Sequence, residues 1–406
     1  MGLTLPATDD AAEVRALLGR QLRHTAKVLL RLPVSAPDPA LRGCHGAVAT
    51  LLRSLGERSP GDLLRLLRPP SISVLVHCAD DAAREGDAGR ASGHIRALLP
   101  ALLLELARTG RLPHGVPWPL PLDALWSVPG NLHVAVPGCT GARFEPGAVT
   151  LLLAGGRLER LDLAAPTTVP GVTVTAPFPL VAPGMALALT DASPLALNEA
   201  HPDKDGNRVD LGGHPASEWT EALRAALEVV ADAMPALRAE MDVVVQQLVP
   251  VGWDAERHLS ASFKEAIGTI YLTLHPQRMT MVEALIHEFQ HNKVNALVHL
   301  DPVLENAFWP LYASPVRPDP RPLWGVLLAV HAFLPVAELY RLLEASGHPL
   351  SRSAGFRDRW RRIIAGNHSG MTTLLEHARP TAAGQALLDE LAALDAAHQA
   401  LGPGTP

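Results

Sequence analysis

Leucine and alanine recur at helical spacing through most of residues 11–110. In the segments AAEVRALLGRQLRHTAKVLLRL and HIRALLPALLLELART, apolar residues return every three or four positions, which indicates helices with one buried face. Prolines interrupt this pattern and divide it into several helices. They are Pro33, Pro37, Pro39, Pro69 and Pro70. We therefore expect residues 1–125 to form a helical N-terminal region.

The pattern of polar and apolar positions changes over residues 126–214. Short runs such as LHVAVPG, AVTLLLAGG and MALALTD are alternating or rich in β-branched residues, and proline and glycine separate them. Strands of this length with such boundaries are typical of a small antiparallel sheet. The sequence therefore predicts a β-rich middle region.

From Ser217 onwards the chain is again amphipathic and mainly helical, with Pro235 expected to kink the first long helix. One short strand, GTIYLTL at residues 268–274, interrupts the helices. Four helical stretches follow, at residues 281–300, 323–345, 356–365 and 382–400. Residues 215–406 thus form a third, mainly helical region, and the whole chain is predicted to be an α+β protein.

Composition narrows the range of partners. The chain has 406 residues, of which 48% are hydrophobic, so it is long enough to bury a sizeable core. Its formal charge of -6 and pI near 6.3 provide no basic field for nucleic acid. Lysine and arginine do not cluster, so an anionic membrane surface is not expected to bind it either.

The cysteines and the N-terminus point to a reducing compartment. Three cysteines are far apart and lack CxxC spacing, which argues against a disulfide framework. They are Cys44, Cys78 and Cys139. The acidic N-terminal segment lacks the apolar core of a signal peptide, and the longest apolar stretch, residues 325–337, is too short to span a bilayer. We expect a cytoplasmic protein without a membrane partner.

The motif HEFQH carries the candidate chemistry. His287 and His291 are four residues apart in a predicted helix, so their side chains share one face and can bind one metal ion. Imidazole nitrogens at this spacing suit zinc, iron or nickel. Glu288 would lie beside the metal, as a general base or as a group that orients the site.

The residues around this motif favour a real helix over a chance match. Thr280 and Glu283 have the spacing of an N-terminal capping box, so Glu283 is interpreted as a cap. Apolar residues follow at Leu285, Ile286 and Phe289, and these are expected to form the buried face. The short strand that precedes the helix, at residues 268–274, also favours a real motif.

A third metal ligand must come from another part of the chain. Val294 and Leu297 stand where a metzincin carries glycine and histidine, so that subclass is excluded. The favoured candidate is His331, because an imidazole in an apolar helix is costly to bury without a partner. Glu305 and Glu338 are the alternatives.

The proline-rich loop SPVRPDPRPLWG holds two arginines, Arg317 and Arg321. An ordinary surface loop would explain them. Alternatively, the prolines stiffen the loop so that one guanidinium binds a carboxylate bidentately beside the metal.

These motifs together resemble a bacterial family, the HExxH-motif proteins found with ribosomally made peptides. The resemblance rests on HEFQHNKVNALVHL, followed by SPVRPDPRPLWGVLLAVHAF. Upstream, it includes SPL near residue 193, VDLGG, Trp219, LVPVG and SASFKEAIGTIYLT. It covers residues 185–345 and leaves the N-terminal helices without a counterpart.

Members of this family are regarded as iron(II)- and 2-oxoglutarate-dependent β-hydroxylases of peptide residues. The resemblance therefore implies a precursor peptide and molecular oxygen as substrates, and iron with 2-oxoglutarate as cofactors. It implies His287 and His291 as iron ligands and His331 as the third. Arg321 becomes the first candidate to bind the carboxylate of 2-oxoglutarate, and Arg317 the second.

The family also implies a zincin-like catalytic part within the α+β chain. There, strand 268–274 would lie beside the motif helix with an edge available to an extended peptide. Some relatives carry their histidine one turn earlier, where this chain has Leu328.

Two other functions stay open. One is a zinc-dependent metallopeptidase that uses the same histidines, with Glu288 as its base. The other is a binding protein whose metal site is only structural.

Overall fold

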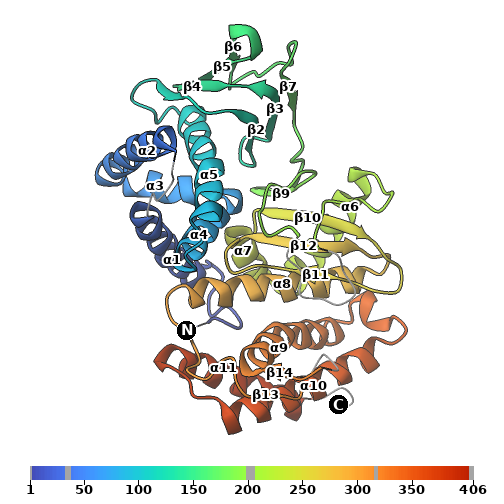
Figure 1. The fold of residues 1–406 in the computed structure, drawn as a ribbon. Helices are drawn as coiled ribbons and strands as arrows, with labels where there is room; N and C mark the ends of the chain where they lie inside the picture. The colour runs from blue at the N-terminus through green and yellow to red at the C-terminus, as the bar shows by residue number, and fades with distance from the viewer. Residues whose placement is uncertain (1, 33–37, 198–205, 315–318, 402–406) are drawn as a thin grey trace. The chain divides into compact units, whose positions relative to one another are not determined.

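A computed structural model describes residues 2–32, 38–197, 206–314 and 319–401 (Figure 1). The fold is mixed α+β, with helices at both ends of the chain and a sheet-rich middle, as the sequence predicted. The contacts within the chain form two compact units. One contains residues 1–21, 181–185 and 210–406, and the other contains residues 22–180 and 186–209.

The second unit begins with helices. They are α1 (Ala12–Arg31), whose second half lies in this unit, α2 (Pro39–Arg58), α3 (Pro60–Leu67), α4 (Pro70–Arg84) and α5 (Ala88–Arg108). Prolines stand in the first turn of α2, α3 and α4, where the missing N–H costs no hydrogen bond. Pro39 and Pro70, two of the prolines that divide the helical pattern in the sequence, therefore mark where helices begin.

The same unit also contains two antiparallel sheets, which confirms the strand pattern read from the sequence. One has the order β1-β4-β5-β6 and the other β2-β3-β7. Their strands are β1 (Val116–Trp118), β2 (Leu122–Ser127), β3 (Leu132–Cys139), β4 (Gly141–Glu145), β5 (Ala148–Leu152), β6 (Leu158–Asp162) and β7 (Thr173–Thr175). The N-terminal helices and the β-rich region thus share one unit.

The first unit is built around a mixed sheet with the order β11-β12-β10-β9-β8. Its strands are β8 (Leu180–Ala182), β9 (Met185–Leu187), β10 (Gln247–Trp253), β11 (Ser260–Ala261) and β12 (Thr269–Leu274). Strand β12 is fully buried, pairing in parallel with β10 and antiparallel with β11. The expectation that residues 268–274 offer a free edge is wrong, because the chain between β10 and β12 folds back and covers that edge with β11.

The helices of this unit follow the predicted order. They are α6 (Ala216–Ala233), α7 (Pro235–Val244), α8 (Arg278–Val298), α9 (Leu323–Ala345), α10 (Phe356–His377) and α11 (Ala382–Ala400). Pro235 begins a new helix instead of kinking one. Two short strands, β13 (Leu311–Tyr312) and β14 (Arg321–Pro322), pair antiparallel. The bounds of α9 and α11 agree with the prediction, whereas α10 extends well past residue 365.

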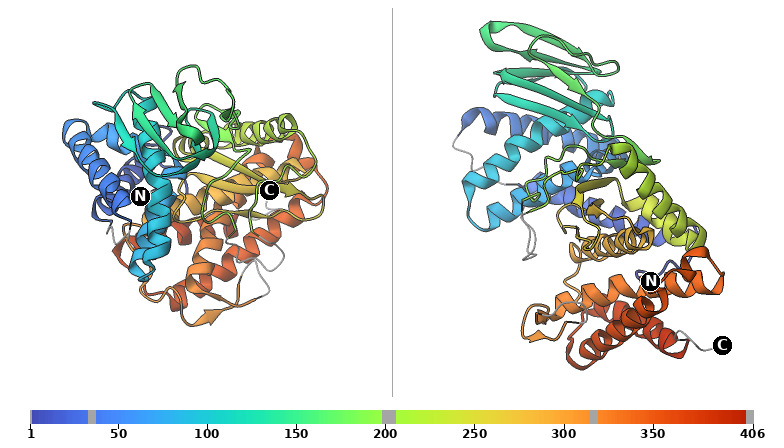
Figure 2. Two further views of the ribbon diagram at one scale, coloured as in Figure 1. Left: turned by 45° about the horizontal axis from the view of Figure 1, so that its top comes forward. Right: turned by 90° about the vertical axis from the view of Figure 1, so that its right-hand side faces the viewer.

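Helix α8, which carries the motif, lies between the sheet and helices α9 to α11 (Figures 1 and 2). It is buried on more sides than its apolar residues predicted, and several of its buried polar residues have hydrogen-bond partners. Asn292, for example, accepts from Gly268 N at 2.6 Å and donates to Thr269 O at 3.3 Å, which joins the helix to the start of β12. The motif is therefore fixed to the sheet by hydrogen bonds as well as by packing.

The predicted capping box is wrong. Helix α8 begins after Gln277 and has no side-chain cap. Glu283 accepts a hydrogen bond from the Tyr340 hydroxyl and pairs with Arg359 at 2.7 Å instead. A guanidinium is a stronger partner for a carboxylate than a backbone N–H, so tertiary contacts decide the role of Glu283.

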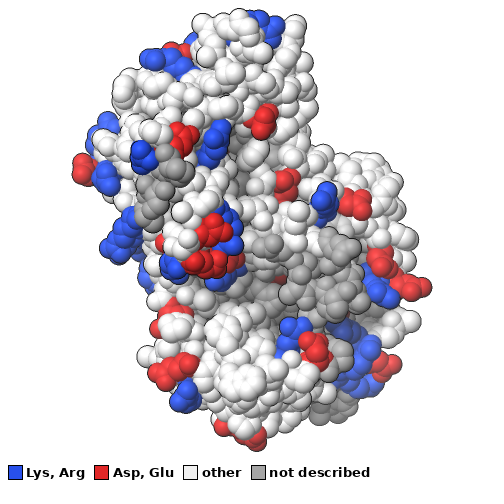
Figure 3. Space-filling view, in the orientation of Figure 1, with Lys and Arg blue, Asp and Glu red and all other residues white. Residues whose placement is uncertain are grey.

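Helix α9 is long and apolar enough to cross a membrane by length and composition, but 72% of its apolar window is buried inside the structure. Packing within this unit therefore accounts for its hydropathy. On the face seen in Figure 3, acidic and basic side chains are interspersed, without a large field of one sign.

Candidate metal centre

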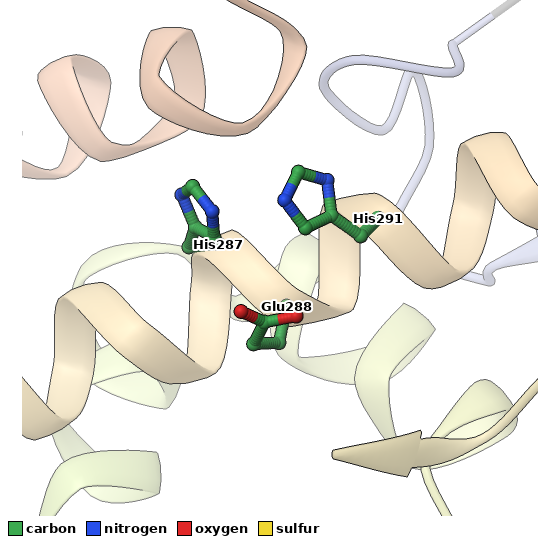
Figure 4. Close-up of side chains that lie close together, drawn as sticks. All are labelled: His287, Glu288 and His291. Atoms are coloured by element: carbon green, nitrogen blue, oxygen red, sulfur yellow. The ribbon is translucent and has the colours of Figure 1, made fainter. Parts of the chain in front are cut away.

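Two imidazoles and one carboxylate come together on α8. The ligand atoms of His287, Glu288 and His291 all lie within 4.8 Å of one another. The two rings leave the same side of the helix, whereas the Glu288 side chain leaves on another side (Figure 4). The ring centroids of His287 and His291 are 4.4 Å apart, so both rings face one small volume. The geometry is that expected of histidines one helical turn apart.

Both imidazoles are poised to be neutral, which is the form that binds metals. Burial lowers the pKa of His287 well below its usual value, and His291, His258 and Arg359 lower it further. Burial also lowers the pKa of His291, against the opposing effect of Glu288. Among the described residues, neither Nδ1 atom has a hydrogen-bond partner. A buried imidazole nitrogen without a partner is costly, and a metal ion fits this pair of donors.

Glu288 is only 2% exposed, and two serine hydroxyls hold its carboxylate. Ser260 donates to Oε1 and Ser262 donates to Oε2, each at 2.7 Å. Ser260 belongs to β11, so the edge strand of the sheet and the motif helix position this carboxylate together. An ionised carboxylate has lone pairs left for a metal or a proton after two such bonds.

His331, the predicted third ligand, is fully buried on α9 but is not a member of this cluster. Its Nε2 donates to the backbone oxygen of Leu3 at 3.1 Å. Burial and the nearby Lys293 lower the pKa of His331 to about 3, although the bond to Leu3 opposes this. In this structure the imidazole anchors the N-terminal segment.

The two alternative ligands also lie outside the cluster. Glu305 is exposed, and its backbone N–H donates to Arg379 O at 2.8 Å. Glu338 accepts from Arg341 at 2.6 Å and from His398 at 3.1 Å. Burial opposes ionisation of Glu338, but these bonds lower its pKa to about 2. Glu338 is thus part of a separate ion-pair network.

Of the two arginines predicted to bind a carboxylate, the structure describes only Arg321. Arg321 lies on β14, and its guanidinium pairs with Asp319 at 2.9 Å. Arg317 lies outside the residues that the structure describes.

A cavity of about 640 Å³ opens onto His291. Leu328 also lines it. Most of the remaining wall is apolar and includes Phe263, Val298, Leu304, Ala307, Phe308 and Trp324. A side chain of a substrate could therefore reach His291 through an apolar passage.

Sequence reasoning missed four groups that contact the cluster or its neighbours: Ser260, Ser262, Phe333 and Arg359. The serines stand in the SAS segment that supported the family resemblance, so their position was visible but their role was not. Phe333 packs its ring 4.7 Å from that of His287. No local pattern links either Phe333 or Arg359 to the motif, because packing of α9 and α10 brings them there.

The comparisons with known proteins identify no relative. No family model matches the chain, and a search of curated proteins finds no match.

The buried neutral state of His331 makes the stability of the metal-free protein depend on pH. Because the pKa is about 3 when folded and about 6.5 when unfolded, the unfolded chain binds more protons between these values. Stability is therefore lost as pH falls below 6.5, by about 2 kcal/mol from this residue between pH 7 and pH 5. His331→Gln should reduce that loss in urea unfolding at the two pH values. An unchanged pH dependence would contradict the assignment.

Proposed function

We propose that this protein is an iron(II)- and 2-oxoglutarate-dependent enzyme that β-hydroxylates a residue of a ribosomally made precursor peptide. The observation that carries the proposal is the pair of imidazoles, His287 and His291, which face one small volume. His291 also lines the apolar cavity. The resemblance of residues 185–345 to the HExxH peptide-modification family supplies the reaction class.

The donors present suit this chemistry. Two imidazoles and one carboxylate form the ligand set of many non-haem iron oxygenases. His287 and His291 would hold the iron, and Glu288 is the third donor within reach of both. Iron with bound 2-oxoglutarate and oxygen would supply the oxidising power for an unactivated carbon–hydrogen bond.

The chain's own residues would position the peptide and exclude water. Apolar side chains such as Trp324 and Leu328 line the approach to His291, which favours a dry site. Ser260 and Ser262 hold the Glu288 carboxylate in place. In the zincin-like arrangement that we propose, an extended peptide would pair with the edge strand β11 rather than with β12.

A zinc-dependent metallopeptidase is the second candidate, and one observation favours it. Glu288 is buried beside both imidazoles, where it can act as the general base toward water. This function would use His287 and His291 for zinc and would not need 2-oxoglutarate.

The test uses the full chain, reconstituted with iron(II) under anaerobic conditions. The protein is mixed with 2-oxoglutarate and the precursor peptide encoded beside its gene, and oxygen is then admitted. We expect the peptide to gain one oxygen atom by mass and succinate to be released without cleavage. Peptide fragments formed with zinc alone would contradict the hydroxylase and support the metallopeptidase.

Glu288→Gln separates both enzymes from a purely structural metal site. The amide keeps an oxygen donor and both imidazoles remain, so we expect the metal content to be retained while turnover is lost. Metal analysis and the mass assay are run on the same sample. Unchanged hydroxylation by this variant would contradict a catalytic role for Glu288.

A further inference from the structure

Residues 2–4, which we call the strap, lie buried against the motif helix within the first unit. Leu3 and Thr4 are only 4% and 2% exposed. The chain from residue 2 to residue 10 nevertheless forms neither helix nor strand. Figure 4 shows this N-terminal segment in pale blue beside the motif helix. Tertiary contacts, not regular secondary structure, therefore hold the strap in its slot.

The main-chain oxygens of the strap accept hydrogen bonds from buried side chains of α8 and α9. The pairs are Gly2 O with Lys293 at 3.4 Å, Leu3 O with His331 at 3.1 Å, and Thr4 O with Gln290 at 3.0 Å. The strap thus contacts the helix that carries the histidine pair and also the helix that packs against it. Each of these buried donors would lose this partner if the strap left its slot, so the seated strap is favoured.

A carboxylate on α11 holds the strap by its N–H groups. Glu390 Oε2 accepts from Leu3 N at 3.0 Å and from Thr4 N at 3.2 Å. Hydrogen bonds to an ionised carboxylate are stronger than bonds between neutral groups. Glu390 belongs neither to the histidine cluster nor to the wall of the apolar cavity. It therefore anchors the strap without being part of the candidate metal centre.

The strap and Glu288 lie on opposite sides of the histidine pair. At about 100° per residue, the two strap donors of α8 lie on one side of the stripe formed by His287 and His291, and Glu288 lies on the other. Phe333 of α9 packs against the His287 ring, so this ring faces α9, which the strap also contacts. His331 joins the two, because it bonds to the strap and helps to lower the pKa of His287.

The strap is the boundary of this site that moves most easily. The other sides are formed by α8, by α9 and by the edge strand β11, which holds Glu288 through Ser260. A segment without regular structure opens at a lower free-energy cost than packed helices or paired strands do. The apolar cavity, for its part, reaches His291 but neither His287 nor Glu288.

We propose that the strap is a gate of the metal centre. A divalent ion such as iron(II) or zinc(II) enters and leaves while the strap is out of its slot, and the seated strap slows both steps. This inference rests on the proposed function only for the metal at His287 and His291, which the hydroxylase and the peptidase share. The strap contributes no ligand, so it changes how fast the ion exchanges and not how tightly it binds.

The experiment measures zinc(II) exchange rather than turnover. Release from the zinc-loaded full chain into an excess of a chelating dye, and uptake by the metal-free chain, are followed by stopped flow. Glu390→Ala removes the acceptor of both strap N–H groups and should raise both rates by the same factor, roughly 10- to 100-fold, with an unchanged Kd. Asp389→Ala removes an exposed carboxylate from the neighbouring position of α11 and should change neither rate.

Gly2→Ala loosens the strap without changing any charge. A Cβ at this position would lie 2.7 Å from Leu5 O and 2.8 Å from Ala7 N, which is too close for the backbone to stay in place. This variant should also exchange zinc faster in both directions with an unchanged Kd. Its unfolding midpoint shows that the rest of the chain remains folded.

The outcomes separate the gate from the metal centre. Wild-type rates in both Glu390→Ala and Gly2→Ala would overturn the gate and leave the metal centre standing. Faster release without faster uptake would also overturn it, because that result describes a weakened site. A wild-type protein that binds neither zinc nor iron would overturn the metal centre, and the proposed function with it.

Discussion

His291→Ala is expected to abolish tight iron binding and, with it, the proposed hydroxylation. The variant leaves His287 as the only imidazole in the cluster, and one imidazole does not hold the ion. Since loss of a group that only supports a ligand already costs 10- to 100-fold in affinity, we expect a loss of at least about 100-fold here. Metal content after dialysis against buffered iron(II) and zinc(II) measures it.

The same variant should leave the metal-free fold intact. His291 is partly buried, and its Nδ1 has no hydrogen-bond partner in the described part of the chain, so alanine removes an unsatisfied group. His299→Ala is the matched control, because it lies at the end of the same helix and lines the same cavity, while its Nε2 bonds to Lys264 O. A His291→Ala protein that retains one equivalent of iron and of zinc would refute the metal centre.

The proximity of His287 and His291 was predictable because it is local. Two histidines four residues apart share a face wherever the helix forms, so no tertiary knowledge is needed to bring His287 and His291 together. The helix itself followed from periodicity. The side chains that contact the helix could not be predicted from periodicity. Ser260 and Ser262 reach Glu288 only because the chain before β12 folds back as β11.

The prediction of His331 as the third ligand rested on the cost of burying an imidazole and on the family resemblance, and burial does not specify the partner. His331 is indeed fully buried, as an apolar helix predicts. Its partner is a backbone oxygen of Leu3, 328 residues earlier, which no spacing rule reveals. The same limit applies to Glu283. Its local pattern predicted a helix cap, but its carboxylate pairs with Arg359, 76 residues away. Local patterns fix where a side chain points on its helix, and packing decides what it meets.

A buried ion pair joins Lys293 of helix α8 to Glu240. Of the substitutions considered, those at this pair are expected to change the free energy of unfolding most. Lys293 and Glu240 are 1% and 2% exposed, and their charged atoms lie 2.6 Å apart. Burial lowers the pKa of Lys293 and raises that of Glu240, and each partner opposes the effect on the other. Each charge is therefore tolerated only because the other is present.

Lys293→Met should destabilise the metal-free protein by about 3–5 kcal/mol, because it leaves the Glu240 carboxylate buried without its cation. Lys293→Met/Glu240→Leu should recover most of this loss, since it removes both desolvation costs and fills the space with apolar side chains. Urea unfolding measures the two differences. Lys264→Met, at a lysine that is 53% exposed, controls for the loss of a positive charge and should change stability by less than about 1 kcal/mol. A double variant as unstable as the single one would mean that Lys293 stabilises α8 through packing of its aliphatic stem.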